Sequence, residues 1–166
     1  MADENSAASG FLDPDTWFAT LPGVVVAAGA LFTDPGGSVL LVKPNYRDHW
    51  TLPGGICELG EPPHLGCARE ISEELGLRCT PGPLLAIDWS QAYGSHQRPI
   101  MHFVFDGGTL ADGSGIVLQQ EELDDWRFIP PAELAGYLAP YGVARMRAAL
   151  AGRAAGAAIY QPAFRG

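Results

Sequence analysis

Residues 55–77 decide the fold and read GICELGEPPHLGCAREISEELGL. Residues 62–75 of this stretch are predicted to form a helix. Proline suits the first turn of a helix, and Gly76 follows directly after the last apolar residue, where glycine suits a helix end. Residues 56–61, which precede the helix, are predicted to form a loop. The stretch therefore predicts a loop followed by a helix.

Three carboxylates gather on one side of the predicted helix. Glu70, Glu73 and Glu74 fall within an arc of about 100°, and the opposite arc carries Leu65, Ala68, Ile71 and Leu75. Glu70 and Glu74 are like charges four residues apart, which costs an isolated helix about 0.2–0.5 kcal/mol. A hard divalent cation would neutralise them, since such ions prefer carboxylate oxygens. The alternative is a solvated acidic face on a surface helix.

The spacing of these residues resembles the Nudix box, the signature of the Nudix hydrolase family. Every position that the box specifies is present, at Gly55, Glu61, Arg69, Glu70, Ile71, Glu73, Glu74, Gly76 and Leu77. The sequence WTLPGG at residues 50–55 is similar to the WxLPGG that many members carry. Residues 125–128 and 131–134 are similar to the late strand and helix of the family. The resemblance spans roughly residues 24–138.

The resemblance implies an α/β fold, an α/β/α sandwich with a mixed β-sheet between helices. It also implies an enzyme, a pyrophosphohydrolase that uses Mg²⁺ or Mn²⁺ to cleave a nucleoside diphosphate linked to another group, X. The substrate would then be a nucleoside triphosphate, a dinucleoside polyphosphate, a nucleotide sugar or an ADP-ribose type of molecule. The alternative is a Nudix-fold module that binds a nucleotide for regulation without turnover.

The roles of the family transfer to the matching positions of the box. The metal ligands would be three carboxylates and one backbone carbonyl, from Glu70, Glu73, Glu74 and Gly55. Glu61 and Arg69 would pair to fix the loop against the helix, which is a structural role. The metal would neutralise charge on the leaving group and position or acidify a water for attack at phosphorus.

Candidates for a general base lie outside the box. Glu121 and Glu122 come just before the late strand, a region from which many family members send a carboxylate to the metal site. Either residue is a candidate to bind metal or to orient the water. The alternative is a solvated turn, because residues 119–125 are rich in acids.

Three further residues are predicted to bind substrate: Lys43, Arg47 and Tyr93. Lys43 and Arg47, together with Arg98, are candidates for holding phosphate, and a surface cation is the alternative for each. Tyr93 follows the box at an offset where dinucleoside polyphosphate hydrolases of this family often carry a tyrosine. The proline that marks many ADP-ribose hydrolases near this offset is absent.

Apolar runs predict a sheet along the rest of the chain. Strands are expected at residues 24–32, 39–43, 50–52, 84–89, 100–105 and 126–129, the first two as a hairpin. Further helices are expected at residues 131–138 and 143–158. His102 alternates with apolar neighbours on its strand and is interpreted as a packed core histidine. Residues 16–158 are expected to form the Nudix domain, between a flexible tail at 1–15 and a second tail at 159–166.

Composition limits the partners. The chain has 166 residues and a net charge of −9, so phosphate polymers and anionic membranes would be repelled, and the expected partner is a small nucleotide. The three cysteines have no metal-binding spacing and are expected to be reduced. No signal peptide is apparent, and we expect a cytoplasmic protein. A homodimer through residues 16–32 or the C-terminal helix is left open.

Overall fold

The computed structural model describes residues 12–92 and 98–163 and contains both strands and helices. The strands are β1 (Val25–Thr33), β2 (Val39–Pro44), β3 (Gly54–Ile56), β4 (Leu84–Ser90), β5 (Ile100–Thr109), β6 (Leu123–Ile129) and β7 (Ile159–Ala163). The helices are α1 (Pro14–Ala19), α2 (Pro63–Leu75) and α3 (Pro140–Ala155), with a 3-10 helix, η1 (Pro131–Gly136). No helix in these residues is long and apolar enough to cross a membrane.

One mixed sheet contains the strands. Their order is β6-β2-β1-β5-β4-β7, and β3 pairs with β1 beside this path. β1 runs parallel to β5, and β4 runs parallel to β7, while the other pairs are antiparallel. The predicted hairpin of the first two strands is confirmed by the antiparallel pair of β1 and β2.

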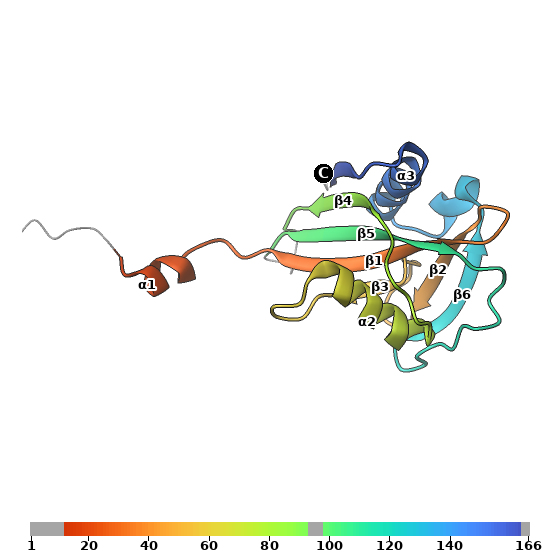
Figure 1. Cartoon of the computed structure of the whole chain (residues 1–166), viewed down its shortest axis with the longest axis horizontal. Coiled ribbons are helices and arrows are strands. Elements are labelled where there is room, and N and C mark those ends of the chain that lie inside the picture. The colour runs from red at the N-terminus through yellow and green to blue at the C-terminus, as the bar shows by residue number, and fades with distance from the viewer. Residues whose placement is uncertain (1–11, 93–97, 164–166) are drawn as a thin grey trace, which may run out of the picture.

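Helices cover both faces of the sheet (Figure 1). α2 packs on one face, over a core that includes Phe32, Cys67, Ile71 and Leu75. α3 packs on the other face, over a core that includes Leu31, Leu85, Met146 and Ala149. The predicted α/β/α sandwich with a mixed sheet is therefore confirmed. α1 has no buried residue and stands apart from the sheet in Figure 1.

β1 positions the loop that precedes α2. It pairs with β3 at Ala27, Ala28 and Gly29. The approach is close, because a Cβ at Gly29 would lie 2.6 Å from the carbonyl oxygen of Pro53. The same oxygen accepts the backbone N–H of Ala30 at 3.2 Å. The small residues of β1 therefore allow the loop to lie directly against the sheet.

Several predicted boundaries differ from the structure. Residues 50–52 form only isolated bridges, and the strand lies at β3 instead, where glycines permit close pairing with β1. Residues 159–163 form β7, so the predicted boundary at residue 158 leaves out a strand that hydrogen bonds to β4. The helix predicted at 131–138 is the shorter η1, and α3 spans 140–155 because Gly156 ends it in a left-handed conformation.

The close packing of α3 on β4 predicts opposite effects for two glycines. A Cβ at Gly152 would collide with the carbonyl oxygen of Leu85, whereas at Gly142 it would meet only the side chain of Leu138, at 3.4 Å. Gly152→Ala is expected to lower the free energy of unfolding by about 1–3 kcal/mol. Gly142→Ala, the matched control, is expected to leave it unchanged or raise it by up to about 1 kcal/mol. Urea denaturation measures both, and equal midpoints would contradict this packing.

Candidate active site

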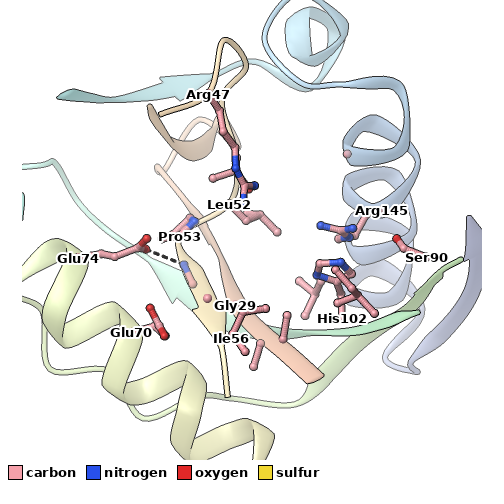
Figure 2. Close-up of a pocket in the computed structure, with 18 of the residues that line it drawn as sticks. Gly29, Arg47, Leu52, Pro53, Ile56, Glu70, Glu74, Ser90, His102 and Arg145 are labelled. Atoms are coloured by element: carbon pink, nitrogen blue, oxygen red, sulfur yellow. Dashed lines mark hydrogen bonds between the residues drawn. The ribbon is translucent and has the colours of Figure 1, made fainter. Parts of the chain in front are cut away.

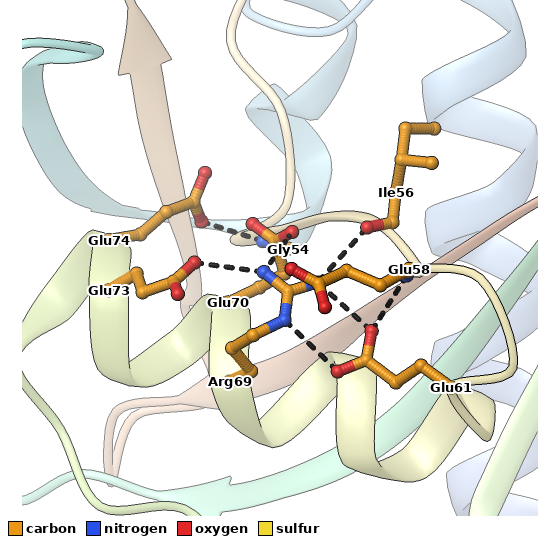
Figure 3. Close-up of polar contacts among 8 residues, drawn as sticks. All are labelled: Gly54, Ile56, Glu58, Glu61, Arg69, Glu70, Glu73 and Glu74. Atoms are coloured by element: carbon orange, nitrogen blue, oxygen red, sulfur yellow. Dashed lines mark hydrogen bonds and ion pairs between the residues drawn. The ribbon is translucent and has the colours of Figure 1, made fainter.

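Two glycines bring the loop backbone against the carboxylates of α2. The backbone N–H of Gly54 donates to Glu74 Oε2 at 2.7 Å (Figure 3). Gly54 has a φ of 132°, in the region that favours glycine. A Cβ at Gly55 would lie 2.5 Å from Glu70 Oε2. No larger residue therefore fits at position 55 while Glu70 keeps this position.

Arg69 connects the loop to the helix carboxylates (Figure 3). Its Nε and Nη2 donate to the two carboxylate oxygens of Glu61, each at 3.0 Å. Its Nη1 donates to Glu70 and to Glu73, each at 2.9 Å. Nη2 also donates to the backbone carbonyl oxygen of Ile56 at 3.1 Å. The predicted pair of Glu61 and Arg69 is present, and the guanidinium additionally spans two of the three helix glutamates.

Burial distinguishes the three helix glutamates. Glu74 is only 7% exposed, and desolvation raises the pKa of its carboxyl to about 8, with a further upward contribution from the nearby Glu70 charge. Desolvation also raises the pKa of Glu70, although Arg69 opposes this shift. Glu73 is exposed and contacts Arg69. Glu74 is therefore the carboxylate that is most costly to ionise unless a cation lies beside it.

The buried face of α2 is rotated from the predicted one. Leu65, expected to pack, is 52% exposed, whereas Glu74, expected on the outer face, is buried beside Leu75. Gly66 packs toward the loop, where an added Cβ would lie 2.8 Å from Cys57 Sγ. α2 thus packs against the loop as well as the sheet. The apolar pattern within the helix does not reveal this contact with the loop.

The donor chemistry fits a hard divalent cation. Carboxylate oxygens and a loop carbonyl are the ligands that Mg²⁺ and Mn²⁺ prefer. Glu74 is buried among like charges and would gain most from a cation. Within residues 12–92 and 98–163, no three His, Cys, Asp or Glu side chains are arranged as metal ligands. One oxygen each of Glu70 and Glu73 accepts from Arg69, and Glu74 Oε2 accepts from Gly54, so an ion would engage the second oxygen of each carboxylate.

The glutamates line a cavity of about 700 Å³ that extends to α3. Figure 2 shows Glu70 and Glu74 on the α2 side, and His102 and Arg145 on the α3 side. Arg47 also lines the cavity, from the chain between β2 and β3. The volume suits a ligand of nucleotide size.

Only some of the residues that were predicted to bind substrate line the cavity. Arg47 and Arg98 line the cavity, as Gly55 does. Lys43 is not among the lining residues, and its ammonium group donates to the carbonyl oxygens of Pro44, at 2.8 Å, and Arg47. The prediction for Tyr93 falls outside the described residues.

The two candidate bases also occupy different places. Glu122 lines the cavity, and its charge contributes to the raised pKa of Glu74. Glu121 is not among the lining residues, and its backbone carbonyl accepts a hydrogen bond from Asn45 Nδ2 at 2.8 Å. The geometry favours Glu122.

Sequence reasoning missed the polar residues on the α3 side of the cavity. Arg145 Nε donates to Oδ2 of the fully buried Asp88 at 2.9 Å. His102, predicted to be a packed core residue, is only partly buried and lines the cavity. Its neighbour on β1 is Ala27, which is too small to cover it. An aspartate inside the apolar run LLAIDWS was the available signal.

A comparison with protein families identifies this architecture. The NUDIX domain model matches residues 23–151, and the chain belongs to this family.

Individual relatives cover different shares of the chain. An ADP-ribose pyrophosphatase of Mycobacterium tuberculosis is 37% identical over 86 residues, which are 49% of this chain and 41% of that protein. A MutT-like protein of Streptomyces ambofaciens is 28% identical over 127 residues, 76% of this chain and 77% of that protein. A crystal structure of a UDP-X diphosphatase has a TM-score of 0.70 at 21% identity, covering 91% of this chain and 76% of that one, which supports the fold. The chain thus aligns with about two fifths of the length of the mycobacterial relative.

Proposed function

We propose that this protein is a metal-dependent Nudix pyrophosphohydrolase, which cleaves the pyrophosphate linkage of a nucleoside diphosphate linked to another group. The environment of Glu74 carries this proposal. Its buried carboxyl, with a pKa raised to about 8, lies near Glu70 and Glu122 at a cavity of nucleotide size. A carboxylate in this environment is stabilised when a divalent cation binds.

We assign the cation to the four predicted ligands, Gly55, Glu70, Glu73 and Glu74. A bound Mg²⁺ or Mn²⁺ would supply charge neutralisation at the phosphates and a water of lowered pKa. Arg69 orients Glu70 and Glu73 through its Nη1 contacts. Glu122 is the proposed general base and accepts a proton from the attacking water on a carboxylate oxygen. The water oxygen then bonds to phosphorus as the anhydride P–O bond breaks.

The proposed substrate class is ADP-ribose or a nucleotide sugar. The similarity to the mycobacterial ADP-ribose pyrophosphatase supports this class. The cavity supports it as well, because it continues past the glutamates to α3 and so leaves room for a group beyond the diphosphate. Arg47 is the proposed contact for the scissile diphosphate, as it lines the cavity, and Arg98 lines the cavity as well.

The experiment is a phosphate-release assay with a coupling phosphatase, across nucleoside triphosphates, ADP-ribose, dinucleoside polyphosphates and nucleotide sugars. We expect turnover of ADP-ribose or a nucleotide sugar with Mg²⁺ and none with EDTA. A regulatory Nudix module would instead bind a nucleotide, as seen by calorimetry, without hydrolysing any of the panel. Turnover that persists in EDTA would contradict the metal assignment.

The state of the cysteines bears on the compartment that we propose for the protein. The three cysteines are free thiols, and burial raises the pKa of each, to about 12 for Cys67. Free thiols suit a reducing compartment, and we propose the cytoplasm. A small nucleotide, and neither a nucleic acid polymer nor a membrane, is the proposed partner. A homodimer is proposed as the assembly to test by light scattering.

A further inference from the structure

The α3 side of the cavity has a different chemistry from the glutamate side. Its floor contains small and polar residues of the sheet, namely Ala27, Gly29, Ser90 and His102. Arg145 reaches into it from α3, and Figure 2 shows its guanidinium beside His102, across the cavity from Glu70 and Glu74. β3 passes between the two sides in this view. A molecule that fills the cavity therefore meets two separate sets of polar groups.

The charges of the lining residues are divided between these two sides. The acids that line the cavity are Glu70, Glu73, Glu74 and Glu122, all of which lie in or near the glutamate cluster. The chain has only ten lysine and arginine residues against nineteen acids, yet four of its arginines are among the lining residues. Arg69 is engaged by the glutamates, and the other three are Arg47, Arg98 and Arg145. The arginine side chains of this acidic protein are thus concentrated at one cavity.

Arg145 is held in place by a buried partner. Its Nε and Nη2 lie 2.9 Å and 2.8 Å from Asp88 Oδ2, and the hydroxyl of Ser90 donates to the same oxygen at 3.3 Å. Asp88 is fully buried and Arg145 is 12% exposed at its side chain. A guanidinium fixed in this way loses little conformational entropy when it binds a ligand. Its planar set of donors matches a carboxylate or a phosphate.

We propose that the α3 side of the cavity is an anion subsite, in which Arg145 binds a carboxylate or phosphate monoester that the substrate carries in addition to its scissile diphosphate, and Arg98, which also lines the cavity, adds positive charge. The proposal rests on the proposed function. The scissile diphosphate must lie at the glutamates, where the metal ligands are, so an anion on the far side of β3 is a second group. Asp88 neutralises one arginine, but Arg47 and Arg98 leave the lining residues outside the glutamate cluster with an excess of positive charge.

The test uses two pairs of ligands that differ only in one anionic group. UDP-glucuronate and UDP-glucose differ by a carboxylate on X, whereas 2′-phospho-ADP-ribose and ADP-ribose differ by a phosphate on the nucleoside. Dissociation constants are measured by titration calorimetry with Ca²⁺, which takes oxygen ligands in a looser geometry than Mg²⁺. We expect the anionic member of at least one pair to bind about tenfold tighter, as for a charge-assisted bidentate contact. The pair that responds identifies which group of the substrate occupies the subsite.

Variants distinguish a specific contact at the subsite from a nonspecific effect of positive charge. Arg145→Gln alone would leave Asp88 buried without its partner, so it is combined with Asp88→Asn, which keeps the shape of the pair. This double variant is expected to reduce the preference to about twofold or less, and the exposed Arg98→Gln is expected to reduce it in part. Arg147→Gln is the control, because Arg147 is exposed on the same helix and does not line the cavity.

Binding and turnover give independent answers. Equal affinity within both pairs, no measurable binding of any member, or a preference that survives in the double variant would overturn the subsite. Hydrolysis is measured separately with Mg²⁺. A preference that depends on Arg145, without hydrolysis of any member, would support the subsite and reject the proposed catalysis.

Discussion

Glu74→Gln is expected to lower kcat by about three orders of magnitude or more. A metal-centred charge stabilisation contributes several kcal/mol to the transition state, and each 1.36 kcal/mol corresponds to a factor of ten in rate. Glutamine keeps the shape of the side chain and an oxygen that accepts the Gly54 N–H, but it is a poor ligand for a hard cation. The coupled phosphate assay, with whichever substrate proves active, measures this loss.

The same substitution is expected to stabilise the metal-free protein. The folded-state pKa of Glu74 is about 8, above the usual glutamate value of 4.5, so the folded protein retains a proton on this carboxyl that the unfolded chain releases. Its contribution to stability is fully present below about pH 4.5 and is lost as pH rises toward about 8. The melting temperature of Glu74→Gln relative to wild type should therefore rise between pH 5 and pH 8 in EDTA. Excess Mg²⁺ should remove this advantage by stabilising the wild type.

Glu73→Gln is the matched control for these two effects. Glu73 is exposed, so its replacement is expected to reduce turnover without the rise in metal-free stability. Unchanged turnover in either variant would contradict the assignment of that glutamate as a metal ligand. A melting temperature of Glu74→Gln that falls with pH in parallel with wild type would contradict the burial of the carboxyl.

Local signals in the sequence were sufficient to predict the elements whose ends are marked by residues within or next to them. α2 begins at Pro63 and ends at Leu75, directly before Gly76, whose φ is 66°, as the proline and glycine predict. The β1–β2 hairpin forms around the turn at Asp34, whose side chain accepts the backbone N–H of Ser38 at 2.7 Å. The contacts that stabilise these elements lie within a few residues, so a local pattern contains the necessary information.

Elements that depend on distant partners were not predictable in this way. β3 contains two glycines and becomes a strand only because β1 offers small residues opposite it. β7 exists because β4 presents a free edge about seventy residues earlier in the chain. The strand propensity of either segment is weak, and tertiary pairing decides the outcome.

The same difference between local and distant contacts applies to the candidate site. The box residues are close in sequence, so their pattern predicted the cluster of Glu70, Glu73 and Glu74, while the family resemblance implied the pair of Glu61 and Arg69. Asp88 and Arg145 are 57 residues apart and meet only when α3 packs on β4. Lys43 stays a predicted substrate contact, and the two backbone carbonyls that its ammonium group contacts are not revealed by a sequence pattern.

Arg69→Ala is expected to have the largest combined effect on stability and activity. The substitution removes five contacts of one guanidinium, with Glu61, Glu70, Glu73 and the carbonyl of Ile56. Glu61 would then retain the N–H of Glu58, at 2.9 Å, but no cation among the contacts described here. Losing one partner of such a partly buried network is expected to cost about 2–4 kcal/mol, seen as a lower melting temperature.

The effect of Arg69 on activity is expected to act through the metal. Removing an outer contact that orients a ligand typically costs about 10–100-fold in metal affinity or activity. Arg69→Ala should therefore raise the Mg²⁺ concentration needed for half-maximal turnover, and Arg69→Lys should recover little, because an ammonium group lacks the planar donors that span three carboxylates. Arg78→Ala is the control, since Arg78 is exposed just after α2 and forms no ion pair among the described residues. A variant that melted like wild type and kept its Mg²⁺ requirement would show that Arg69 neither fixes the loop nor orients the glutamates.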